Sequence, residues 1–111
     1  MTINEYQKLA MRTCETDLPE IKLITEGVMG LCGEAGEAIE IVKKHLAHGH
    51  VLDNEHLAIE LGDVAWYIAE TAYALGYDLE SIFKMNIEKL QRRYPNGFDS
   101  ESSINRDKSI L

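Results

Sequence analysis

The chain has 111 residues, of which 45% are hydrophobic and 27% are charged, a composition typical of one globular domain. Its 19 acidic residues against 11 lysines and arginines give a formal net charge of −8, which argues against a basic face for polymeric nucleic acid. No apolar run approaches the roughly 20 residues that span a bilayer, the first residues do not resemble a signal peptide, and two cysteines are too few for a disulfide framework, so we expect a cytoplasmic protein that does not bind membranes.

The first two predicted elements are helices. Thr2 and Glu5 have the spacing of a capping box, and apolar residues then recur at helical period. A second helix is expected to begin within residues 17–20, with Asp17 as its cap, and to continue to about Ala47.

Four glycines recur at every third position of this second helix, namely Gly27, Gly30, Gly33 and Gly36. Each costs about 1 kcal/mol relative to alanine in a helix interior. Close approach of another helix or of a ligand would offset that cost, and a kink near the first two is the alternative. For Gly33 and Gly36 we expect such an approach beside the neighbouring acidic residues.

Two further helices follow a predicted loop. Residues 45–53 are expected to be that loop, with its three histidines exposed and not bound to metal. The third helix is predicted at residues 53–75 and ends at Gly76, and the fourth runs from Asp78 to about Tyr94.

No convincing strand is predicted, so the expected fold is all-α, an antiparallel four-helix bundle with short connections. Residues 1–98 are predicted to form a single domain and residues 99–111 a polar tail. We expect that tail to be partly ordered at most, or to pack on a partner chain.

Two pairs of acidic residues interrupt the apolar faces of the second and third helices: Glu34, Glu37, Glu60 and Asp63. Positions i and i+3 lie on the same side of a helix, so two such helices side by side direct four carboxylates into one space. A carboxylate at the border of a core is costly unless it is paired or binds metal. The pattern predicts a divalent-metal site for Mg²⁺, or for Mn²⁺ in its place. Internal salt bridges are the alternative.

Three polar residues lie on or beside the apolar face of the fourth helix, namely Asn86, Lys89 and Arg93. We expect them near the mouth of the acid cluster, where an amide and two cations suit phosphate oxygens. The alternatives are a buried amide that fixes the bundle register for Asn86 and ordinary surface charge for the two cations.

A second apolar stripe on the third helix consists of Ile59, Trp66 and Tyr73, on the side away from the core. A helix that is apolar on two sides is buried on two sides. The outer side is expected to pack on a second subunit or to form a base pocket, and we expect a homodimer or homotetramer.

Three stretches of the chain carry a family resemblance: Gly-Leu-Cys-Gly-Glu-Ala-Gly-Glu at 30–37, Glu-Leu-Gly-Asp-Val-Ala-Trp-Tyr at 60–67, and Asn86-x-x-Lys89-Leu90-x-x-Arg93-Tyr94-Pro95-x-Gly97-Phe98. With them the chain resembles the MazG-like all-α nucleoside triphosphate pyrophosphohydrolases, in particular short, single-domain, phage-type members. The acidic motif of that family is Glu-Glu-x-x-Glu followed by Glu-x-x-Asp, and Gly33 replaces its first glutamate here.

The resemblance implies Mg²⁺-dependent hydrolysis of a nucleoside triphosphate between the α and β phosphates, giving the monophosphate and pyrophosphate. The two acid pairs would hold the metal, which would bind the triphosphate and lower the pKa of an attacking water. Glu37 or Glu34 would orient or deprotonate that water.

The resemblance also implies roles for residues outside the acid pairs. Asn86, Lys89 and Arg93 would neutralise phosphate charge. Trp66 or Tyr67 would stack on the base, although core or interface packing is the commoner use of such aromatic residues. The rival interpretation of the chain is a non-enzymatic oligomeric helical bundle, a regulatory or interaction module whose acids are salt-bridged.

Overall fold

The computed structural model describes residues 1–106, and all the regular elements in that part are helices. They are α1 (Ile3–Met11), α2 (Glu20–His48), α3 (Asn54–Ala74), α4 (Leu79–Arg93) and α5 (Ser100–Ile104). The predicted all-α class is confirmed. Within residues 1–106, no helix combines the length and the hydropathy needed to cross a bilayer.

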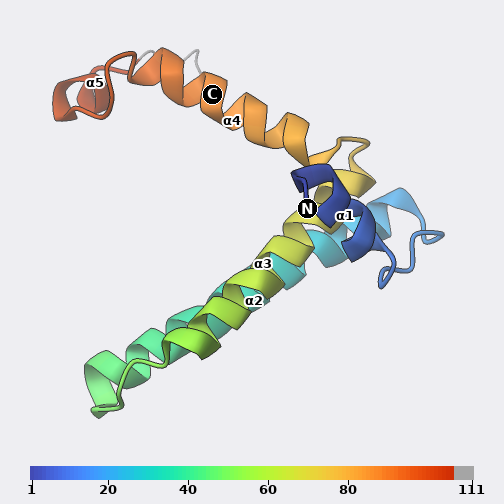
Figure 1. The fold of residues 1–111 in the computed structure, drawn as a ribbon, viewed down its shortest axis with the longest axis horizontal. Coiled ribbons are helices and arrows are strands. Elements are labelled where there is room, and N and C mark those ends of the chain that lie inside the picture. Colours follow the sequence, from blue (N-terminus) through green and yellow to red (C-terminus); the bar gives the residue numbers. More distant parts are fainter. Residues whose placement is uncertain (107–111) are drawn as a thin grey trace.

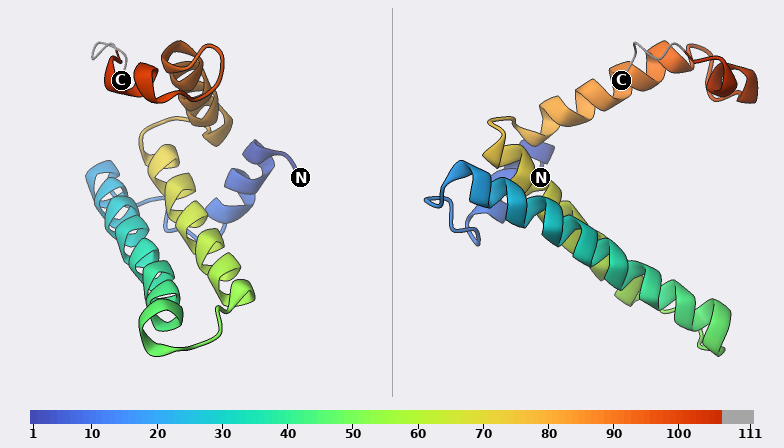
Figure 2. Two further views of the ribbon diagram at one scale, coloured as in Figure 1. Left: turned by 90° about the vertical axis from the view of Figure 1, so that its left-hand side faces the viewer. Right: turned by 180° about the vertical axis from the view of Figure 1, so that it is seen from behind.

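The antiparallel pair of α2 and α3 is the main body of the molecule (Figure 1). Helix α1 packs beside α3 on the side away from α2, as the left view of Figure 2 shows. Helix α4 touches α1 and α3 where it begins and then diverges from the α2–α3 pair. The four long helices of one chain are therefore adjacent at one end, and α4 leaves this arrangement along most of its length.

Three of the predicted helix starts are capped as expected. Thr2, Asp53 and Asp78 each accept a hydrogen bond from the backbone N–H three residues later, at 3.1, 3.0 and 2.8 Å. The prediction for Asp17 is wrong, because α2 begins after Pro19, which makes no side-chain capping bond. A proline before the first helical residue fixes the backbone without a capping side chain.

The predicted loop at residues 45–53 is wrong in its first half. Helix α2 continues to His48 and ends at Gly49, whose φ of 73° lies in the left-handed region that favours glycine. The ring nitrogen Nδ1 of His45 lies 2.8 Å from the carbonyl oxygen of His50, which closes the turn. The histidines of this segment are exposed, as expected.

Helix α5 was not predicted. It is capped by Asp99, whose carboxylate accepts hydrogen bonds from the backbone N–H and the hydroxyl of Ser102 at 2.6 and 2.7 Å. Part of the predicted tail is therefore helical, while residues 107–111 lie outside the described residues.

Helices α2 and α3 approach each other closely at Gly27 and Gly30. A Cβ atom at either position would collide with a side chain of α3, which for Gly30 is the ring of Tyr67. Among residues 1–106, a Cβ at Gly33 or Gly36 would meet nothing within 4 Å, so the expected close approach of a neighbouring helix beside the acids does not occur within this chain. The expected approach of a ligand there stays a prediction. The glycines that matter for packing lie at the end of the pair that is nearer to α1.

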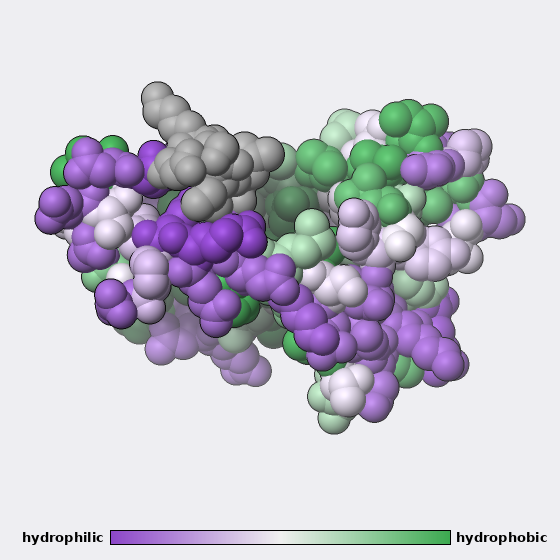
Figure 3. Space-filling view, turned by 90° about the horizontal axis from the view of Figure 1, so that it is seen from above, coloured by the Kyte–Doolittle hydropathy of each residue, from purple (hydrophilic) through white to green (hydrophobic). Residues whose placement is uncertain are grey.

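The buried core is small and lies where α1, α3 and α4 meet. Its buried apolar residues are Ala10, Ala69, Ala72 and Leu79. Gln7 ties the three helices together, because its amide donates to Ala69 O at 3.3 Å and accepts from Leu79 N at 2.8 Å. Hydrophobic residues also gather at the surface, as Figure 3 shows for one face.

Candidate metal and nucleotide site

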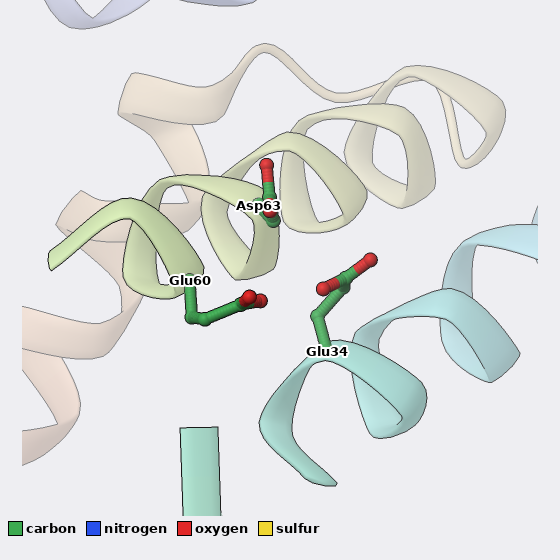
Figure 4. Close-up of side chains that lie close together, drawn as sticks. All are labelled: Glu34, Glu60 and Asp63. Atoms are coloured by element: carbon green, nitrogen blue, oxygen red, sulfur yellow. The ribbon is translucent and has the colours of Figure 1, made fainter. Parts of the chain in front are cut away.

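Three of the four predicted acids meet between α2 and α3. Glu34 of α2 and Glu60 and Asp63 of α3 each offer one carboxylate oxygen, and these three oxygens lie within 4.8 Å of one another. Figure 4 shows Glu34 and Glu60 extending toward each other, with Asp63 one turn further along α3. Carboxylate oxygens this close together can converge on one divalent cation.

The crowding of these carboxylates raises the pKa of Glu34. The largest cause is the hydrogen bond that Glu34 shares with Glu60, followed by desolvation and by the negative charges around it, including Asp63 and Glu37. Neighbouring like charges disfavour ionisation of the group. A bound cation would reverse that effect.

Glu60 is largely enclosed. Its side chain is 12% exposed, and Oε1 lies 3.4 Å from Nε2 of His56, one turn earlier on α3. The other oxygen, Oε2, is buried and has no hydrogen-bond partner among the described residues. A buried carboxylate oxygen without a partner is costly, and a bound cation would satisfy it. We did not identify His56 from the sequence, although its spacing of four residues from Glu60 was a signal.

Glu37 lies outside this group of three. It is exposed on α2, one turn beyond Glu34, and its charge contributes to the raised pKa of Glu34. The structure thus brings three of the four predicted acids together and places the fourth at the edge of the cluster.

The donor set fits a hard divalent cation such as Mg²⁺ or Mn²⁺. All three donors are carboxylate oxygens, and the clustered atoms include no histidine nitrogen or cysteine sulfur. Among residues 1–106, no lysine or arginine forms an ion pair with Glu34, Glu60 or Asp63, which weakens the salt-bridge alternative. Asp63 is exposed, so the cluster is accessible to water and to a ligand.

Trp66 and Tyr67 form one wall of a pocket of about 360 Å³ that Glu34 and Asp63 also line. The two aromatic rings meet edge to face, with centroids 5.0 Å apart. The indole Nε1 of Trp66 donates to Ala10 O at 3.1 Å and to a threonine hydroxyl of the following turn at 3.0 Å. Because α1 holds Trp66 in this way, the outer stripe is covered within the chain at that position.

The structure does not bring the three polar residues of α4 to the acid cluster of the same chain. Asn86 is exposed, and Lys89 and Arg93 are half-buried. Asn86 and Lys89 line a pocket on α4 itself, while Arg93 lines another between α4 and α5. Figure 2 shows why: α4 points away from the α2–α3 pair.

A second buried carboxyl group, Glu70, lies one turn beyond Tyr67 on α3, and sequence reasoning missed it. Its exposed fraction is 3%, and Sγ of Cys14 donates to its Oε2 at 3.5 Å. Its Oε1 is buried and has no partner among the described residues. Burial raises the pKa of Glu70, and burial together with Glu70 raises the pKa of Cys14 to about 11. The available signal was spacing, since Glu70 continues the helical face of Asp63 and Tyr67.

Comparison with known proteins gives two matches. The model of the MazG nucleotide pyrophosphohydrolase domain matches residues 25–98, a span that contains both acid pairs, the aromatic pair and the polar residues of α4. The chain is also similar to "Gene 37 protein" of Mycobacterium phage L5, with 39% identity over 114 residues that cover 96% of this chain and 100% of that protein. No solved structure matches the chain.

Proposed function

This chain belongs to the MazG nucleotide pyrophosphohydrolase family, and from that premise we propose that it is a Mg²⁺-dependent nucleoside triphosphate pyrophosphohydrolase. The reaction is hydrolysis between the α and β phosphates, which yields a nucleoside monophosphate and pyrophosphate. One observation carries the proposal: inside the matched span, three carboxylates converge, and Glu60 holds a buried oxygen that has no hydrogen-bond partner among residues 1–106. A cation and the phosphates that it binds would complete that arrangement.

In this proposal Glu34, Glu60 and Asp63 hold the cation. The bound cation would supply positive charge for phosphate oxygens and lower the pKa of a water molecule. Glu37 is exposed beside the cluster, where its carboxylate can orient a water molecule or accept its proton. Trp66 and Tyr67 line the pocket next to the acids, where they can shield the phosphates from bulk water and pack against the nucleoside.

We also propose that the active form is a homodimer or homotetramer. Large apolar side chains on α3 and α4 are exposed in the single chain: Ile59 at 58%, Leu61 at 60%, Phe83 at 42% and Ile87 at 53%. Exposed apolar surface of this kind favours association. A second copy can also supply the phosphate-binding residues that α4 carries away from the acids of its own chain.

Chain sizing tests that assembly. Ile59→Asp should lower the apparent mass in size-exclusion chromatography with light scattering, because a charge would be buried in the interface. Glu55→Gln, a polar exchange at an exposed position one turn earlier on α3, serves as the control. An unchanged mass for Ile59→Asp would remove that face from the interface.

The division of the chain and its compartment are proposals of the same kind. The family match ends at residue 98, which supports a catalytic domain of residues 1–98 followed by a tail of residues 99–111. The proposed compartment is the cytoplasm, where nucleoside triphosphates and Mg²⁺ occur together.

The test is a screen of canonical and modified nucleoside triphosphates against the purified protein. Substrate loss is followed with Mg²⁺, with Mn²⁺, with Ca²⁺ and with a chelator. We expect turnover with the first two ions and none with the chelator, because the three carboxylates alone offer no positive charge to the phosphates. Failure to cleave any nucleotide at any metal concentration would contradict the proposal and favour the non-enzymatic module.

A further inference from the structure

A second pocket, of about 570 Å³, adjoins the one beside the acid cluster. Trp66 and Tyr67 line both pockets, so the two share a wall. The second pocket extends from these aromatics to the turn after α1 and to α2, where Cys14, Met29 and Gly30 line it. Its volume lies within the range of small-ligand sites.

Glu70 lines this second pocket, and its burial has no structural explanation. Only 3% of the residue is exposed, its Oε1 has no partner among the described residues, and its Oε2 accepts only the thiol of Cys14. A thiol is a weak donor. A buried carboxyl group with so little compensation destabilises a fold, so the pocket keeps a strong hydrogen-bond acceptor at a cost.

The spacing along α3 relates this group to the acid cluster. Glu70 follows Asp63 by seven residues, or about 10 Å along the helix axis. Tyr67 lies between them and packs on the helix backbone at Gly30. One pentose ring with its 5′ carbon bridges a gap of this order, so a nucleotide whose phosphates are held at Asp63 can reach Glu70 with its base.

The charged side chains at this pocket are acceptors, and three of its donor groups are already used within the chain. Thr13 and Trp66 donate to Ala10 O and Cys14 donates to Glu70, while the hydroxyl of Tyr67 can donate or accept. Three carboxyl groups line it, those of Glu15, Glu26 and Glu70, and no lysine or arginine among the described residues does. A base with an exocyclic amino group presents N–H donors to such a surface. Thymine and uracil present two carbonyl oxygens that flank a single N–H, and those oxygens repel carboxylate oxygens.

We propose that Glu70 is a specificity-determining residue, which accepts hydrogen bonds from the amino-bearing edge of the base and selects adenine, cytosine or guanine nucleotides over those of thymine and uracil. The inference rests on the proposed function for the placement of the phosphates. It adds a residue outside the acid cluster and a substrate class.

The first test is equilibrium binding, which needs no catalysis. The α,β-methylene analogues of dATP, dCTP, dGTP, dTTP and dUTP are titrated into the full chain with Mg²⁺. We expect at least one amino-bearing analogue to bind about tenfold or more tightly than both the thymine and uracil analogues, as for a hydrogen bond to a charged group. Equal affinities across the set, or tighter binding of the thymine or uracil analogue, would overturn the proposal.

The second test is Glu70→Gln, which preserves volume and introduces an amide donor that suits a carbonyl oxygen. We expect the ratio of affinities to fall by about tenfold, and the same ratio of kcat/KM to fall with it. Glu40→Gln, an exposed exchange on α2 outside the pocket, should leave the ratio unchanged. An unchanged ratio in Glu70→Gln overturns the proposal. If that variant does not fold, the wild-type binding series decides the proposal alone.

The two proposals fail separately. Selective binding without hydrolysis of any natural triphosphate would keep the role of Glu70 and refute the pyrophosphohydrolase. Hydrolysis without base selectivity would support the pyrophosphohydrolase and refute the role of Glu70.

Discussion

Replacing Glu60 by glutamine tests whether this residue is a metal ligand or an acid that only stabilises the fold. The exchange keeps the volume of a side chain that is 12% exposed, so packing changes little. It removes one negative charge from a group of three carboxylates whose oxygens lie within 4.8 Å of one another. If these residues hold Mg²⁺, kcat/KM should fall at least about a hundredfold, because loss of an outer-shell partner alone costs 10–100-fold.

The same variant should lose the stabilisation that Mg²⁺ gives to the wild-type chain. At a concentration ten times its Kd, a ligand that binds only the native state adds about 1.4 kcal/mol. For a domain of this size that corresponds to a rise in Tm of roughly 6 °C. Without metal the variant should be at least as stable as the wild type, because the exchange relieves repulsion between carboxylates.

Differential scanning fluorimetry with and without Mg²⁺, run beside the activity assay, measures both effects. Glu40→Gln is the matched control, since Glu40 is exposed and makes only a surface pair with Lys43 at 3.7 Å. A Glu60→Gln protein that keeps wild-type turnover and the full Mg²⁺-dependent rise in Tm would refute the assignment of Glu60 as a ligand. A variant that unfolds in the absence of metal would show instead that Glu60 is structural.

Three further predictions follow from packing and from the buried groups. Gly30→Ala should destabilise the protein by about 1–3 kcal/mol in chemical denaturation, because the new Cβ collides with the Tyr67 ring. Gly33→Ala, with open space around it, should instead stabilise the protein by up to about 1 kcal/mol. Equal changes in stability for the two variants would contradict the packing. The thiol of Cys14, with its pKa near 11, should react with iodoacetamide at pH 8 about a hundredfold more slowly than exposed Cys32. Mass spectrometry of each site measures the two rates. Comparable rates would show that Cys14 is not shielded. Because burial raises the pKa of Glu70 above its unfolded value, the folded state binds that proton more tightly, and the stability of the fold decreases as pH rises from about 4.5 through the raised pKa. Glu70→Gln should flatten this decrease when denaturant midpoints are measured as a function of pH. Parallel pH profiles of the wild type and the variant would exclude the effect.

Much of the fold could be predicted from local patterns. Helical period, the caps at Thr2, Asp53 and Asp78, and the glycine that follows α3 are properties of a few adjacent residues. The errors also have local causes. Asp17 precedes α2 and could act as its cap, but the chain uses Pro19 instead.

The direction of α4 could not be predicted, because periodicity reports which face of a helix is apolar and not which partner covers that face. In the single chain Phe83 and Ile87 remain exposed. The expected proximity of Asn86, Lys89 and Arg93 to the acids assumed a bundle closed within one chain. In the proposed oligomer, these α4 residues of one subunit lie beside the acid cluster of another subunit.

Part of the candidate site could be predicted from the sequence. Glu34 and Glu60 stood out because each acid interrupts an apolar face, and the structure brings them together with Asp63. Glu70 did not stand out, because one acid on a mixed helix looks like a surface residue until its burial and its contact with Cys14 are known. Burial by a distant segment is a tertiary property that spacing alone does not reveal.

The position of the cleaved bond decides whether this chain is a nucleoside triphosphate pyrophosphohydrolase. Phosphorus-31 NMR of the products formed from the best nucleotide substrate in the presence of Mg²⁺ distinguishes the possible cleavages. We expect equal amounts of nucleoside monophosphate and pyrophosphate, formed only when the metal is present and lost in Glu60→Gln. Orthophosphate with nucleoside diphosphate would place cleavage at the β–γ bond and contradict this expectation.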